Sequence, residues 1–203
     1  MDTYIILDYD DTCFPTTWLA TKGINSKNIK SLNPNFLSRL DTVLFTLLTN
    51  LFKYGQVIII TNAMPAWINI TTELMPKTKP LINKYIRVIS ARKKYQHLSS
   101  DMSLWKELAF KDVIGDKIKS TSQSKRAIPL NIISCGDAIF EYNALIKLST
   151  TLPAQSPKYL KSIRFVQGNI DMDTIIDQLS VLNKSINSIV EMKKNVDMVF
   201  RIG

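Results

Sequence analysis

Short apolar runs alternate with longer stretches of helical periodicity along this chain. The short runs are rich in Val and Ile and predict strands, because β-branched side chains favour extended backbone. Their apolar residues are consecutive, which is typical of strands that are covered on both faces of a parallel sheet. Five such runs are found, at residues 4–7, 57–60, 86–90, 131–134 and 162–166.

Apolar residues recur at helical spacing in the segments between these runs. The longest segment starts at Asn33 and Pro34, where Asn can cap a helix and Pro fits its first turn, and it ends before Gly55. Alternating strands and helices predict an α/β fold: a doubly wound, Rossmann-like and mostly parallel sheet of about five strands with helices on both faces. Further helices are predicted after Pro65, at residues 103–113, after Asp137 and at residues 172–189.

The chain of 203 residues is long enough for one domain, and we expect a single domain over residues 1–203. Residues 13–33 form a connection of mixed composition, for which we predict a short flap or loop. Residues 115–129 are rich in Ser, Lys and Thr, so we predict a flexible polar loop there.

Composition and charge narrow the classes of protein. The net charge of +9 fits an anionic partner such as nucleic acid, but the basic residues are scattered, so a lysine-rich composition explains it better. No apolar run reaches the roughly 18 to 20 residues of a membrane span. The first residues lack the basic start of a secretory signal. We therefore expect a cytoplasmic protein that does not enter a membrane, with nuclear or virion-associated placement left open.

Histidine and cysteine usage excludes further mechanisms. His97 is the single histidine, so a site with several histidines is impossible. The two cysteines, Cys13 and Cys135, form neither a disulfide framework nor a zinc motif. Both flank acidic motifs, so a redox pair is conceivable, but small buried thiols are the better interpretation.

Acidic and hydroxyl side chains stand where the predicted strands end. Asp8, Asp10 and Asp11 follow the first strand, Thr61 ends the second, and Asp137 follows the fourth. In a doubly wound sheet, ligands bind beyond the carboxyl ends of the strands. Like charges that face one point repel unless a cation lies between them, and magnesium prefers oxygen ligands of this kind. The alternative is an acidic turn that caps the next element.

The same residues resemble the motifs of the haloacid dehalogenase (HAD)-like hydrolase superfamily. Asp8-x-Asp10-x-Thr12 after an apolar strand is similar to its first motif, Thr61 at a strand end to its second, and Gly136-Asp137 with Glu141 to its fourth. From Tyr4 to Leu182 the chain is also similar to uncharacterised HAD-like proteins of protists, algae and large DNA viruses that share the Asp-x-Asp-Asp-Thr motif.

This resemblance implies a magnesium-dependent phosphatase. The connections after Thr12 and after Thr61 are short, so we expect a minimal cap or none. Asp8 would be the nucleophile that takes up the phosphoryl group. Asp10 would protonate the leaving oxygen and then activate water. Thr61 would donate a hydrogen bond to a phosphoryl oxygen. An acid two residues after the nucleophile is, in this superfamily, associated with phosphoryl chemistry.

The resemblance also implies the metal ligands and a catalytic lysine. Asp8, the backbone carbonyl of Asp10, and Asp137 would hold Mg²⁺, with Glu141 orienting a metal-bound water. A lysine would neutralise charge on the nucleophile. We expect this lysine to be Lys106, with Lys93 and Lys94 as the competing candidates.

Two other functions compete with a phosphatase of unknown, possibly macromolecular substrate. One is a catalytically idle HAD fold that serves as a binding or scaffolding module. The other is a nucleic-acid-end phosphatase, which only the charge supports. Three indoles could line a substrate pocket or pack in the core: Trp18, Trp67 and Trp105. The oligomeric state is left open.

Overall fold

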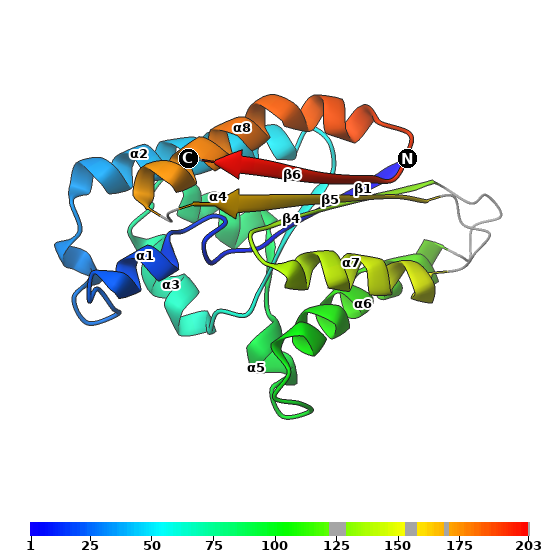
Figure 1. The fold of residues 1–203 in the computed structure, drawn as a ribbon, viewed down its shortest axis with the longest axis horizontal. Coiled ribbons are helices and arrows are strands. Elements are labelled where there is room, and N and C mark those ends of the chain that lie inside the picture. Colours follow the sequence, from blue (N-terminus) through cyan, green and yellow to red (C-terminus); the bar gives the residue numbers. More distant parts are fainter. Residues whose placement is uncertain (122–128, 153–157, 169–170, 203) are drawn as a thin grey trace.

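The computed structural model describes residues 1–121, 129–152, 158–168 and 171–202. Its centre is a six-stranded sheet in which every neighbouring pair of strands is parallel, in the order β3-β2-β1-β4-β5-β6 (Figure 1). The strands are β1 (Asp2–Leu7), β2 (Gln56–Thr61), β3 (Arg87–Ser90), β4 (Leu130–Gly136), β5 (Lys158–Gln167) and β6 (Val196–Ile202). This is the predicted doubly wound, Rossmann-like fold.

Helices cover both faces of the sheet (Figure 1). One core cluster joins the sheet to α1, α2, α3, α4 and α8, and a second joins it to α5, α6 and α7. Strands covered on both faces need apolar side chains at successive positions, which explains the unbroken aliphatic runs of β1, β2 and β4. The helices are α1 (Thr16–Thr21), α2 (Pro34–Leu51), α3 (Pro65–Glu73), α4 (Thr78–Tyr85), α5 (Ala91–Tyr95), α6 (Met102–Thr121), α7 (Ile139–Thr151) and α8 (Met172–Glu191), with a 3₁₀ turn at Ile29–Ser31.

The ends of α2 follow from its sequence. The Asn33 side chain accepts a hydrogen bond from the backbone N–H of Asn35, and Pro34 occupies the first turn, as the sequence predicted. Gly55 lies in the turn before β2, where an added Cβ would come 2.2 Å from the carbonyl oxygen of Thr3. Gly55 therefore allows this turn to pack directly on β1.

Two features of the fold differ from the sequence-based expectations. β6 is an additional strand beyond the five that were predicted. The segment 115–129 was predicted to be a flexible loop, but α6 continues through residue Thr121, and residues 122–128 lie outside the part that is described.

The segment 13–33 contains α1 and the 3₁₀ turn, and Leu19 and Ile29 from it are buried in the main core.

Among the described residues, no helix combines the length and the apolar character that crossing a membrane requires.

Candidate active site at the carboxyl ends of β1, β2 and β4

Three of the predicted site residues lie at one edge of the sheet because their strands are parallel neighbours. Asp8 directly follows β1, Thr61 is the last residue of β2, and Asp137 directly follows β4. The backbone N–H of Asp8 donates to the carbonyl of Cys135, 2.9 Å away, which ties the ends of β1 and β4 together. The strand order reverses between these two strands, and this is where doubly wound sheets bind their ligands.

A buried ion cluster connects the nucleophile candidate to α6 and α7. The Lys106 ammonium donates to Asp8 Oδ1 at 2.6 Å, to the Ile60 carbonyl at 2.8 Å, and to Glu141 Oε1. All three charged side chains are buried, with Lys106 only 1% exposed. Burial lowers the pKa of Lys106, but the charges and hydrogen bonds of Asp8 and Glu141 outweigh this and raise it overall. Lys106 is therefore a permanent cation against Asp8.

The structure also distinguishes the three lysine candidates. Lys106 lies in the first turns of α6, whose apolar neighbours Trp105 and Ala109 pack in the second core cluster and direct its side chain towards the sheet. Lys93 is exposed, and Lys94 pairs at the surface with Asp112 at 2.7 Å. Within the described part of the chain, neither forms a hydrogen bond or an ion pair with Asp8.

Glu141 reaches this cluster because Gly136 has no side chain. A Cβ on Gly136 would come 2.5 Å from Cγ of Glu141 and 2.7 Å from its Oε2. Glu141 is in the first turn of α7, one helical turn beyond Asp137. Its Oε2 atom is buried and has no hydrogen-bond partner.

Asp137 is surrounded by negative charge. Burial, followed by the charges of Asp8, Glu141 and Asp11, raises its pKa from 3.8 to about 8. Thr12 donates a hydrogen bond to its Oδ1 at 3.3 Å. Without a further cation, this carboxyl group is protonated near neutral pH.

Asp10 faces away from the lysine and towards the flap. Its Oδ1 accepts hydrogen bonds from the Thr16 hydroxyl at 2.5 Å and from Trp67 Nε1 at 3.2 Å. Burial, together with the charge of Asp8, raises its pKa from 3.8 to about 6, although the Thr16 hydrogen bond opposes this shift. A carboxyl group with such a pKa can both donate and accept a proton near neutrality.

The loop after β1 is held by its own turn and by α8. Asp11 has a φ of 53°, a left-handed conformation that Asp tolerates better than most residues, and its carboxylate accepts from the backbone N–H of Thr17 at 2.9 Å. The Gln178 side chain of α8 donates to the carbonyls of Asp11 and Thr12 at 2.9 and 2.7 Å. These contacts fix the backbone that follows the nucleophile.

Thr61 and the two cysteines complete the surroundings. The Thr61 side chain is fully buried, and its hydroxyl oxygen accepts from the backbone N–H of Ala63 at 3.0 Å. Cys13 and Cys135 are buried free thiols, and burial raises the pKa of both. Cys13 donates to the carbonyl of Asp8 at 3.2 Å, so its described contact is structural.

The side chains around Asp8 and Asp137 fit a magnesium ion, which keeps several waters as ligands, better than a metal whose ligands are all side chains. No group of three or more His, Cys, Asp or Glu side chains among the described residues is arranged to hold a metal. Magnesium usually binds one or two carboxylates and keeps several waters. The excess of carboxylates around Asp137 and the unpaired Oε2 of Glu141 are features that a divalent ion and its waters would satisfy. Asp8 and Asp137 fit direct ligation because they follow neighbouring parallel strands at the same edge of the sheet, and the unpaired Oε2 of Glu141 suits a metal-bound water.

A cavity of about 420 Å³ opens beside Asp10. Its walls come from α1, the following loop, and the segment after β2, and they include Ile24, Met64, Trp67 and Arg92. The exposed lining of the cavity is mostly apolar and also includes the carboxyl group of Asp10 and the guanidinium group of Arg92.

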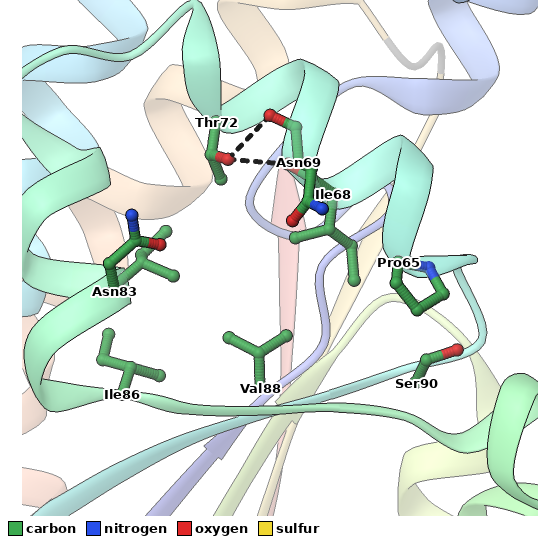
Figure 2. Close-up of a pocket in the computed structure, with 9 residues that line it drawn as sticks. Pro65, Ile68, Asn69, Thr72, Asn83, Ile86, Val88 and Ser90 are labelled. Atoms are coloured by element: carbon green, nitrogen blue, oxygen red, sulfur yellow. Dashed lines mark hydrogen bonds between the residues drawn. The ribbon is translucent and has the colours of Figure 1, made fainter.

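A second cavity, of about 300 Å³, lies on another side of α3. Figure 2 shows it between α3 and β3, where Ile68, Ile86 and Val88 face it and the amides of Asn69 and Asn83 stand beside it. None of these residues belongs to the acidic cluster.

Sequence patterns had not identified several partners of the site. Thr16 lies four residues after Thr12 of the first motif but had no predicted role. For the indoles the sequence left both a pocket and a packing role open: Trp67 lines the cavity, whereas Trp105 is buried in the core. No local sequence pattern identifies Gln178 as a partner of the loop, because it follows Asp11 by 167 positions in the sequence.

No protein-family model matches the sequence, and neither curated proteins nor solved structures give a match. The resemblance to the HAD-like superfamily therefore rests on the sequence motifs alone.

Proposed function

We propose that this protein is a magnesium-dependent phosphohydrolase of the HAD type that works through an aspartyl-phosphate on Asp8. The observation that carries the proposal is the contact of Lys106 with Asp8 at 2.6 Å, at the edge of the sheet where Asp137 also lies. Lysine, nucleophile and second acid come from three separate elements. A role in folding alone does not need two further acids, Asp10 and Asp137, beside this ion pair.

In the first step, an Asp8 oxygen forms a bond to phosphorus while the bond from phosphorus to the leaving oxygen breaks. Asp10 gives its proton to that leaving oxygen. In the second step, water attacks the phosphorus of the aspartyl-phosphate, Asp10 takes the proton of the water, and phosphate leaves. The Trp67 and Thr16 hydrogen bonds orient Asp10 for both proton transfers.

Lys106 and Thr61 act on charge and position. Lys106 keeps Asp8 ionised and offsets negative charge as the phosphoryl group approaches. The Thr61 hydroxyl accepts from Ala63, so its proton is available to a phosphoryl oxygen. Magnesium, held by Asp8 and Asp137, would offset the charge between the carboxylates and the phosphate.

The substrate pocket we propose is the cavity of about 420 Å³ beside Asp10. The leaving group of a phosphoester would lie there, against Met64 and Trp67, within reach of the acid that protonates it. Arg92, which also lines this cavity, would favour a substrate with a second negative charge.

Hydrolysis of an aryl phosphate tests the proposal. We expect turnover that requires Mg²⁺, that is abolished by Asp8→Asn, and that is unchanged by the surface control Asp173→Asn, whose side chain is 68% exposed. Acid quenching of wild-type turnover with a ³²P-labelled substrate should trap phosphate on the protein. Once the acid unfolds the protein, Asp10 no longer activates the water that hydrolyses the aspartyl-phosphate.

Equal turnover by Asp8→Asn would refute the role of Asp8. A folded wild type that binds Mg²⁺ but hydrolyses none of a broad panel of phosphoesters would favour the idle binding module instead.

A further inference from the structure

β6 is the last strand at one end of the sheet. Its inner edge pairs with β5 from Val196 to Ile202, and no other described strand pairs with its outer edge. In Figure 1, β6 is drawn next to β5, with α8 above the two strands and α7 below them. The outer row of N–H and C=O groups is a template on which another strand can form hydrogen bonds.

The sequence of β6 is complementary to itself about Val199. Asp197 and Arg201 lie at equal distances on either side of Val199 and carry opposite charges. Met198 and Phe200 lie next to it and are both apolar. Two antiparallel copies related by a two-fold axis at Val199 therefore place each Asp197 opposite an Arg201.

Backbone geometry agrees with this register. In the proposed pairing, odd-numbered residues face odd-numbered residues and even-numbered residues face even-numbered ones, for example 197 with 201. The residues of such a pair point their backbone groups to the same side of the strand, so the hydrogen-bonding pattern of an antiparallel ladder is preserved.

The two faces of β6 differ in a way that suits continuation of the sheet. Met198 and Phe200 are half-buried under α8, and the Phe200 ring stacks on Phe165 with centroids 6.1 Å apart. On the other face Asp197, Val199 and Arg201 are exposed.

The charges on that exposed face are only partly paired. Asp197 pairs with Arg164 of the neighbouring strand at 3.1 Å. Arg201 makes no ion pair within the described part of the chain. A second copy would bring its own Asp197 to this free guanidinium group.

We propose that two copies of this chain associate through antiparallel pairing of their β6 strands, which joins the two sheets into one. The occupant of the edge is a second copy because the charge pattern matches its own reverse. The two-fold arrangement closes the edge on both copies and leaves no further edge for growth on that side.

Charge exchange tests this pairing in the full chain. In a dimer of the Asp197→Arg variant, cations face cations, and in a dimer of the Arg201→Asp variant, carboxylates face carboxylates. We expect each to raise the dimer dissociation constant by about tenfold or more at physiological salt, since two cross-strand pairs change from attraction to repulsion. An equimolar mixture of the two variants should recover the wild-type constant, because both pairs are again of opposite charge.

Sedimentation equilibrium of the wild type and variants, each checked for folding by circular dichroism, provides the measurement. A wild type that stays monomeric up to concentrations of about 200 μM would overturn the proposal. So would a dimer that both single variants leave unchanged, or a mixture of the two that fails to recover association.

A cross-link gives an independent result. Val199 would face its own copy with Cβ atoms about 4.5 to 5.5 Å apart, so Val199→Cys should oxidise to a covalent dimer. Val166→Cys is the matched control, because Val166 is 42% exposed, close to the 40% of Val199, but lies on β5. Equal cross-linking of the two variants would contradict pairing through β6.

Discussion

Asp137 gives the sharpest test of the electrostatics of the site. Its carboxyl group lies among negative charges, so removing its capacity to ionise should stabilise the metal-free protein at alkaline pH. The substitution Asp137→Asn preserves shape and most hydrogen bonding but abolishes the charge. We expect the variant to be more stable than the wild type at about pH 8, and the difference to be much smaller at about pH 5.

The magnitude follows from the pKa. Burial and the charges of Asp8, Glu141 and Asp11 raise the pKa of Asp137 from 3.8 to about 8. Because the folded-state pKa lies above the unfolded one, this group's contribution to stability is complete below about pH 4 and is lost as the pH rises to 8. A shift of four units corresponds to about 5 to 6 kcal/mol. Asp137 is partly exposed, and water screens its interactions, so we expect a difference of about 2 to 4 kcal/mol.

Urea unfolding followed by tryptophan fluorescence measures this difference. Wild type and Asp137→Asn are compared in EDTA at several pH values between about 5 and 8. Other groups that titrate in this range, such as Asp10, are present in both proteins, so their contributions cancel in the difference. Adding Mg²⁺ at about pH 8 should restore stability to the wild type through binding and have much less effect on the variant. Asp173→Asn, on the exposed first turn of α8, is the control for loss of a carboxylate.

Two results would refute the reasoning. One is a stability difference between wild type and variant that does not change with pH. The other is a variant that is less stable than the wild type at alkaline pH without metal.

Three further substitutions test individual contacts by urea unfolding or titration. Lys106→Met leaves buried carboxylates without their cation and should cost about 3 to 5 kcal/mol, and a loss below 1 kcal/mol would contradict the buried ion cluster. Gly136→Ala should displace Glu141, whose Cγ would lie 2.5 Å from the new Cβ, and cost about 1 to 3 kcal/mol; Gly115→Ala, with open space around it, is the control. Trp67→Phe removes a hydrogen bond that lowers the pKa of Asp10, so the carboxyl carbon of Asp10 should titrate above about 6 by NMR, and an unchanged midpoint would show that the contact is absent in solution.

The sequence was informative where packing imposes a pattern. β2 is a run of aliphatic residues because it is buried on both faces, and residues 57–60 therefore predicted it clearly. Asp8 and Asp137 could be assigned to one edge because parallel strands end on the same side. Lys106 could be ranked above Lys93 and Lys94 because it begins the helix before the fourth strand, and it is the one that contacts Asp8.

Other features depend on contacts that a local pattern does not record. β6 mixes charged and apolar residues because it is an edge strand with one exposed face, so it lacks the signal of the central strands. Residues 115–121 have the composition of a loop, yet they continue α6, whose preceding turns pack in the core. The hydrogen bond from Trp67 to Asp10 depends on a side-chain orientation that the sequence does not specify.

The hydrogen bonds from Gln178 to the loop after β1 have a consequence for biosynthesis. The ribosome delivers Asp11 and Thr12 early, but the side chain that binds their carbonyls belongs to α8 and follows 167 and 166 positions later. One edge of β1 also stays unpaired until its neighbour β4 has been synthesised. Nascent chains arrested before α8 should therefore expose this loop to proteases, and its native backbone should form only once α8 has left the exit tunnel.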